Sequence, residues 1–408
     1  MPPDFVYPEI RFRVPGLQVW LSRPTVEQSH HREDGTGALT LSYHVRGLPE
    51  ETTRVPCIDA SLRWGTTRRS KADPFTSVAV AVSGWITIHP DAPKALEWYM
   101  EQQSKLTTML AFLAGVPMSP DCIQASIDES PHEVSVMVAL RDAKYCPYTN
   151  LHDFYMPRNA MGIDLALVVG NWFERYPKVH MPSQLALSVV ASERLWLHVE
   201  FLSLMQALEG FHRGLFEGNY MTDEEYDSVK KALGDAIPPG VPPDHKDALR
   251  SRIRYGNQFS LRKRLNELAA LLPDSLRLMI LGGEGQVPRR WVDTRNYYTH
   301  WDEELRSNVL DGQGMYYANV RMRHFLRALY LDFIGIPKEA IHASLCNTSN
   351  VSQHLAQLNA IDRRRENPND TSGVILTVTE QKANNLDEPI QSQSEVGTSA
   401  GPSEEGVA

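Results

Sequence analysis

The sequence predicts an α+β fold: a mostly antiparallel, β-rich N-terminal domain with one long helix, then an all-α helical bundle and a disordered acidic tail. Three observations predict it. Short runs rich in β-branched and aromatic residues fill the first 150 residues. After about residue 155, apolar residues recur at helical spacing instead. The final stretch is polar and acidic. These changes place the domains at 1–155 and 160–362, and the tail at 366–408.

The N-terminal domain is expected to contain six strands separated by Gly- and Pro-containing turns. A single helix interrupts them, and it should end at Gly115 and Pro117 because neither residue continues a helix well. In chain order the expected elements are strands 9–14, 38–45, 57–64 and 77–89, the helix 92–114, and strands 122–128 and 132–140.

The bundle is expected to contain several amphipathic helices around one core. Pro182 and Ser183 are typical of a helix start, so a long helix is predicted from there to Leu215. A basic stretch after a Pro/Gly loop should break near Gly256. The full set of expected helical segments is 163–173, 182–215, 223–233, 245–272, 288–300 and 315–334.

Composition excludes several classes of protein. The chain has 408 residues and four cysteines, all far apart, so neither a disulfide framework nor a zinc site is expected. His30 and His31 lack carboxylates at a ligand spacing and lie in a stretch that reads as a flexible loop, so no metal is expected there. No phosphate-binding or dinucleotide-binding glycine motif appears, so no cofactor is expected. The chain also lacks a signal-peptide pattern and a membrane-length apolar run, which predicts a cytoplasmic protein that does not contact a membrane.

Charge is distributed unevenly along the chain. The formal net charge is −9, but residues 246–295 hold eleven basic and five acidic residues. This window is where a polyanion such as RNA would bind, although ordinary solvated helix faces give the same composition. Residues 366–408 hold eight acidic residues and one lysine, which is typical of a solvated disordered tail; Ile375–Thr379 is its one strand-like segment.

The candidate catalytic motif lies in the expected helix 288–300, where Arg295 and Asn296 precede His300. An arginine followed closely by a histidine also occurs at Arg23/His30 and at Arg175/His180. The first pair lies in a loop-like stretch, and a proline inside the second is expected to interrupt its helix. The third pair alone has a polar residue directly after the arginine and lies in the basic window.

This Arg-Asn-x-x-x-His pattern resembles the catalytic motif of HEPN domains. The segments FLSLMQALEGFHRGLF (201–216) and RRWVDTRNYYTHW (289–301) resemble the ApeA-like HEPN branch, and the part around WITIHP (85–90) is similar to the ApeA N-terminal domain. The resemblance covers about 350 residues. It implies a homodimer that places both motifs in one cleft, and a metal-independent endoribonuclease that acts in phage defence by cutting tRNA or other cellular RNA. It also implies that the N-terminal domain receives a phage-derived trigger.

The residue types suit RNA cleavage by the 2′-hydroxyl. The His300 imidazole is suited to proton transfer near neutral pH, and the Arg295 guanidinium to the charge that builds on the phosphoryl oxygens. Asn296 is expected to orient the imidazole or the phosphate, because it shares a helix face with His300. Five residues of an ideal helix turn about 500°, so Arg295 and His300 would converge only at a bent helix end or across a dimer. The alternative is ordinary surface charge at a helix end.

Two residues of the expected helix 182–215 are candidate supporting residues. Glu209 and His212 lie three positions apart, and Glu209 is expected to pair with Arg295 and fix its orientation. A local ion pair without a catalytic part is the alternative.

Further residues near the motif are candidates for RNA binding. Arg289 and Arg290 are expected to contact phosphates, or else to be solvated at the helix start. Tyr297, Tyr298 and Trp301 are suited to stacking on unpaired bases, or else to packing in the core or in a dimer interface.

Two other functions remain open at this point. The domain is also compatible with a non-catalytic HEPN module that binds RNA or a nucleotide, with the motif serving dimerisation. It is equally compatible with a structural component of a defence complex.

Overall fold

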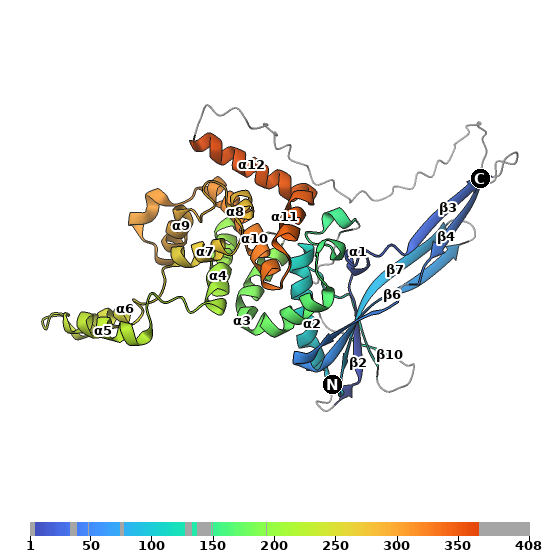
Figure 1. The fold of residues 1–408 in the computed structure, drawn as a ribbon, viewed down its shortest axis with the longest axis horizontal. Coiled ribbons are helices and arrows are strands. Elements are labelled where there is room, and N and C mark those ends of the chain that lie inside the picture. Colours follow the sequence, from blue (N-terminus) through green and yellow to red (C-terminus); the bar gives the residue numbers. More distant parts are fainter. Residues whose placement is uncertain are drawn as a thin grey trace, which may run out of the picture. The chain divides into compact units, whose positions relative to one another are not determined.

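The structure is a computed structural model that describes residues 5–32, 39–47, 49–73, 77–126, 133–136, 148, 150–192 and 194–366. It confirms the fold class, because an antiparallel sheet region with one long helix precedes a helical region (Figure 1). The expected tail, except for Glu366, lies outside the described residues, as does the strand-like segment within it. Within the described ranges, no helix is long and apolar enough to cross a membrane.

The N-terminal region is built on a six-stranded sheet in the order β10-β9-β2-β7-β6-β5, in which every neighbouring pair is antiparallel. Alternate residues of β2, Ile10 and Phe12, are buried opposite Ile88 and Ile86 of β7, so one face of the sheet lies in the core. β1 pairs with β8, and β3 pairs with β4. The strands are β1 Val6–Tyr7, β2 Glu9–Arg13, β3 Val26–Arg32, β4 Leu39–Val45, β5 Glu51–Val55, β6 Ala60–Asp73, β7 Ser77–Pro90, β8 Lys94–Ala95, β9 Cys122–Ser126 and β10 Glu133–Ser135.

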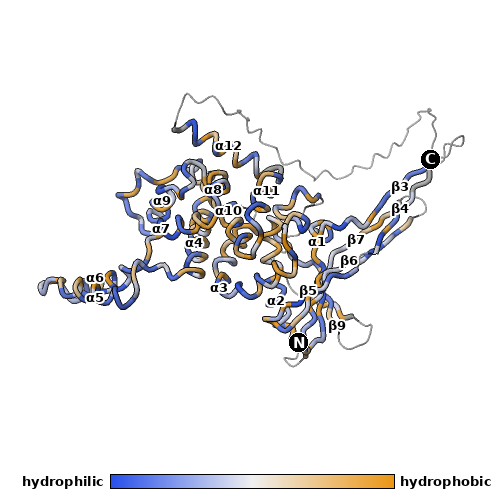
Figure 2. The backbone as a smooth tube through the Cα atoms, viewed as in Figure 1, coloured by the Kyte–Doolittle hydropathy of each residue, from blue (hydrophilic) through white to orange (hydrophobic). Residues whose placement is uncertain are grey.

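The helical region packs around α3, α4 and α10, and its most hydrophobic stretches lie where these helices meet (Figure 2). Phe112 of α2 stacks on Tyr330 of α10, so the long N-terminal helix shares this core. The helices are α1 Leu17–Trp20, α2 Leu96–Ala114, α3 Leu165–Ala191, α4 Leu197–Leu215, α5 Asp223–Asp235, α6 Pro243–Arg254, α7 Leu261–Ala270, α8 Asp274–Leu281, α9 Arg289–His300, α10 Gly312–Phe333, α11 Lys338–Asn347 and α12 Ser349–Glu366.

The predicted long helix from Pro182 to Leu215 is wrong. Pro182 lies inside α3, and α4 begins only at Leu197. Pro177 also lies inside α3, so it does not interrupt the helix that carries Arg175. The helix bends at one residue with non-helical angles, Val179, and the carbonyl of Lys178 loses the donor that a non-proline residue 182 would supply. That carbonyl faces Gly214 of α4, where a Cβ atom would lie 2.0 Å from it.

The strands also differ from expectation, because β1, β3, β5 and β8 were not among the six expected. The expected strand 57–64 begins later, at Ala60, after a 3₁₀ turn at Pro56–Ile58, and it continues to Asp73. The stretch around His30 and His31 is not a loop, because both residues lie in β3 and pair with β4. Antiparallel pairing with the next strand along the chain, β6 with β7 and β3 with β4, extends these strands, and local composition does not reveal it.

Candidate functional site

Helix α9 carries the motif at its C-terminal end, as the sequence predicts. The helix starts after Pro288, and its last residue is His300. Thr294 is fully buried, and its hydroxyl accepts a hydrogen bond from the backbone amide of Leu310 at 2.9 Å, which fixes the middle of the helix. The next residues become progressively more exposed toward His300. Trp301 ends the helix with φ 53°, a left-handed conformation that is uncommon for a residue with a bulky side chain.

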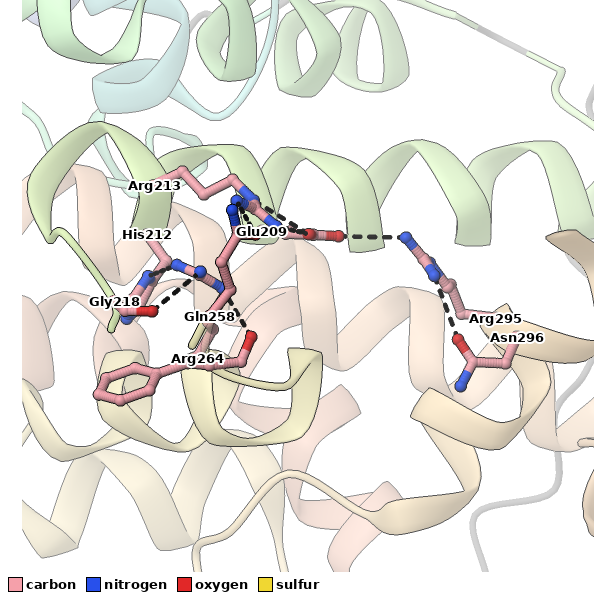
Figure 3. A network of polar contacts seen from close by, with 9 residues as sticks. Glu209, His212, Arg213, Gly218, Gln258, Arg264, Arg295 and Asn296 are labelled. Atoms are coloured by element: carbon pink, nitrogen blue, oxygen red, sulfur yellow. Dashed lines mark hydrogen bonds and ion pairs between the residues drawn. The ribbon is translucent and has the colours of Figure 1, made fainter. Parts of the chain in front are cut away.

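The expected contact between Glu209 and Arg295 is present. Arg295 Nη2 lies 3.2 Å from Glu209 Oε2 on α4, and Arg295 Nη1 donates to Asn296 Oδ1 at 3.1 Å (Figure 3). Glu209 also accepts from Arg213, one turn further along α4, at 3.0 Å. The Glu209 side chain is only 18% exposed, so water screens this pair less than an open surface pair. The carboxylate therefore holds the guanidinium of Arg295 from one side (Figure 3).

His212 does not join this group, although it lies three residues from Glu209. Its side chain is completely buried, and Nε2 lies 2.8 Å from Glu267 Oε2. Arg264 Nη1 donates to Nδ1 at 3.1 Å, so Nδ1 is the acceptor and Nε2 carries the proton. Burial lowers the pKa of His212, which favours this neutral form. His212 therefore bridges α4 and α7 rather than contacting Arg295 (Figure 3).

The two arginines at the start of α9 differ in their surroundings. Arg289 is 73% exposed and has Asp293 as its partner at 3.6 Å. Arg290 donates to the backbone carbonyls of Asn308 and Val309, at 3.2 and 2.9 Å. Arg290 therefore fastens α9 to the chain that follows it, which leaves Arg289 as the freer cation for a phosphate.

The motif aromatics form an exposed cluster that includes two residues the sequence did not single out. Tyr298 stacks on His198 of α4 with ring centroids 5.9 Å apart. Tyr297 and Trp301 both pack edge-on against the ring of Tyr298. Trp196, which precedes α4, packs against His198. Trp196 and Trp301 are 78% and 69% exposed, which is unusual for tryptophan. Only the packing of α4 against α9, which local sequence does not reveal, brings these residues together.

His300 is exposed and makes no hydrogen bond or ion pair with any described residue. The two halves of the motif therefore do not meet within one chain: Arg295 faces Glu209, and His300 lies at the open end of α9. No cluster of three potential metal ligands occurs among the residues described. The geometry offers a positioned cation, an amide and a free imidazole around one helix end.

Comparisons with known families match two regions of the chain. Residues 202–340 match the family model described as Apea-like HEPN, and this range contains most of α4, all of α9 and the complete motif. Residues 4–172 match the model described as ApeA N-terminal domain 1. No curated protein and no solved structure matches the chain significantly. Together the two models cover about three quarters of the chain, which therefore contains an ApeA N-terminal domain 1 followed by an Apea-like HEPN domain.

Proposed function

We propose that the protein is a metal-independent endoribonuclease of the HEPN type, which acts in anti-phage defence by cleaving tRNA or other cellular RNA. The observation that carries the proposal is the end of α9. There an Arg-Asn-x-x-x-His motif, inside a matched HEPN domain, presents a guanidinium fixed by Glu209 together with an unpaired, exposed imidazole. HEPN domains form a family of ribonucleases, and this is the chemistry that such a pair can perform.

The proposed reaction uses the 2′-hydroxyl of the substrate as nucleophile. An imidazole removes its proton, the hydroxyl oxygen attacks the adjacent phosphorus, and the 5′-oxygen leaves with a proton from an acid. Arg295 stabilises the charge on the phosphoryl oxygens, since its guanidinium is always protonated and can donate two hydrogen bonds. Asn296, bonded to Arg295, donates through its amide to the phosphate or to the imidazole.

The proposal includes a homodimer formed through the HEPN domain. One chain supplies a single His300, yet the reaction needs both a base and an acid. A two-fold axis beside the end of α9 would place a second imidazole and a second guanidinium in one cleft. The exposed aromatic cluster around Tyr298 supports such an interface, because it leaves more apolar surface in water than an isolated helix end normally does.

The N-terminal domain is proposed to receive the phage-derived trigger, and unpaired RNA bases are proposed to stack on the part of the aromatic cluster that the dimer leaves open. Arg289 is proposed to contact an RNA phosphate. This assignment is supported by its exposure, whereas Arg290 is held by backbone carbonyls.

Cleavage of total RNA by the purified protein in EDTA tests the proposal. Wild-type protein should cut RNA, and Arg295→Ala and His300→Ala should not. If wild type and variants all shift RNA in a gel without cutting it, the protein is a non-catalytic RNA-binding module. If RNA is neither cut nor bound, a structural role in a defence complex replaces the proposal.

A further inference from the structure

Arg327 of α10 is a cation without an acidic partner among the residues that the structure describes. One of its nitrogens donates to the backbone carbonyl of Gly115 at 3.1 Å, and its guanidinium carbon lies 4.5 Å from the ring centroid of Tyr155. No carboxylate of a described residue lies within 4.0 Å of it. Burial removes water from this guanidinium and thereby lowers the pKa of Arg327. The carbonyl and the aromatic ring offset part of this cost, but neither carries a negative charge.

Two further buried polar groups lie beside this cation. The hydroxyl of Tyr155 and Nδ1 of His324 are both inaccessible to solvent and make no hydrogen bond with any described residue. Tyr155 and His324 are only 2% and 8% exposed, so bulk water does not satisfy these atoms. Their rings are stacked with centroids 6.1 Å apart, and His324 precedes Arg327 by one helical turn. Tyr155 therefore contacts both Arg327 and His324, and the three side chains form one polar cluster.

We propose that Arg327, Tyr155 and His324 form a binding site for a small phosphate-bearing anion. Arg327 supplies the charge and two-pronged donors, and the Tyr155 hydroxyl donates a hydrogen bond to a phosphate oxygen. Neutral His324 donates from Nδ1 in one of its two tautomers. The burial of Tyr155 and His324 favours inorganic phosphate or a mononucleotide over the backbone of a long RNA, which could not enter.

The proposed site lies between residues of the two matched segments of the chain. Gly115 and Tyr155 belong to the segment matched by the ApeA N-terminal domain, whereas His324 and Arg327 belong to the matched HEPN segment. A bound anion would thus tie residues of both segments together. On the same helix, Arg323 pairs with Glu200 of α4 at 2.6 Å, so α10 also contacts the helix that carries Glu209. The proposal does not depend on RNA cleavage.

Titration calorimetry and thermal unfolding of the full chain test the site, with inorganic phosphate and a nucleoside monophosphate as probes and chloride at matched ionic strength as the control. At about 100 times the Kd, one of the two probes should raise the unfolding midpoint on the order of 5 °C. Tyr155→Phe keeps the ring and removes the hydroxyl, so it should weaken binding about 10- to 100-fold. Arg327→Gln should abolish binding, and Arg323→Gln, one turn away and partly exposed, should leave it unchanged.

Each failure has a definite meaning. If neither probe binds to wild type, or if Tyr155→Phe binds as tightly as wild type, the site does not exist and the buried groups are satisfied by ordered water. If a short RNA oligonucleotide displaces the probe, the site belongs to the RNA path, and the assignment to a small anion is overturned. If Arg327→Gln fails to fold, the Tyr155→Phe variant, which keeps the ring, still tests whether the anion site exists.

Discussion

At the level of single residues, the Glu209 carboxylate decides where Arg295 points. It accepts from Arg295 on one side and from Arg213 on the other, so two guanidiniums share one anion. The contact with Arg295 was expected from the sequence, with a local ion pair as the alternative, and both contacts are present. The sequence could not predict that His212 turns away, since Glu267 and Arg264, which hold it, are more than fifty residues distant.

Replacing Glu209 should therefore damage the rate more than the affinity. Glu209→Gln is expected to lower kcat by about 10- to 100-fold while KM changes by less than about threefold, because the guanidinium stays present but loses its orientation. Stability should fall by only about 1 kcal/mol, as for other partly exposed pairs. Steady-state cleavage kinetics measure the effect. Arg213→Gln is the matched control, since it removes the other partner of Glu209, and an equal loss of kcat there would contradict the positioning role.

The exposed imidazole of His300 allows a clean test of its proposed role. His300→Ala should reduce cleavage by at least about 100-fold, the usual worth of a general acid–base group. The free energy of unfolding should change by less than about 0.5 kcal/mol, because the side chain has no partner among the described residues. Cleavage rates and urea unfolding supply both numbers, with His245→Ala on the exposed face of α6 as control. A variant that keeps activity within tenfold of wild type removes His300 from the mechanism.

At the level of elements, the contact between α3 and α4 positions Glu209, and it depends on a glycine. The carbonyl of Lys178, which has no helical donor because residue 182 is proline, approaches α4 at Gly214. Gly210, one turn earlier, faces the ring of Pro182. The proline that looked like a helix start in the sequence is thus accommodated inside α3 by small residues on the neighbouring helix.

Gly214→Ala should consequently destabilise the protein, although alanine favours helix more than glycine does. Its Cβ would lie 2.0 Å from the Lys178 carbonyl oxygen, so the helices must separate, at a cost of about 1–3 kcal/mol. Gly170→Ala, in α3 with open space around the new methyl group, should instead stabilise by about 0.5–1 kcal/mol. Chemical unfolding of both variants measures whether each change in the free energy of unfolding has the expected sign. Equal effects would show that α3 and α4 are not packed closely at Gly214.

At the level of the whole molecule, the sequence predicts the order of the domains and helices better than the boundaries between consecutive helices. Helix α9 was predicted to within a residue, because Pro288 starts it and its polar end stops the apolar pattern. The boundary between α3 and α4 was not predicted, because only tertiary packing explains why Pro182 is tolerated inside α3. The aromatic partners Trp196 and His198 were missed for the same reason: they reach the motif from another helix.

Acid should destabilise the fold through its buried histidines. Burial lowers the pKa of His324 to about 3. Between that value and the unfolded pKa of about 6.5, the unfolded chain takes up a proton that the folded chain does not. Stability should thus fall with decreasing pH, by about 1.4 kcal/mol per pH unit for this residue. In phosphate-free buffer, His324→Gln should flatten the pH dependence between pH 6 and 4, whereas His245→Gln should not. Parallel curves for wild type and His324→Gln would show that His324 is protonated in the fold.

The central claim is that two chains share one metal-free catalytic cleft built from the ends of their α9 helices. The most direct measurement is the initial rate of RNA cleavage in EDTA by a fixed amount of wild-type protein mixed with increasing His300→Ala protein, under conditions in which subunits exchange. The claim predicts that wild type alone is active in EDTA and that excess variant suppresses this activity through mixed dimers. Activity that needs added magnesium, or that stays constant while mixed dimers form, would contradict it.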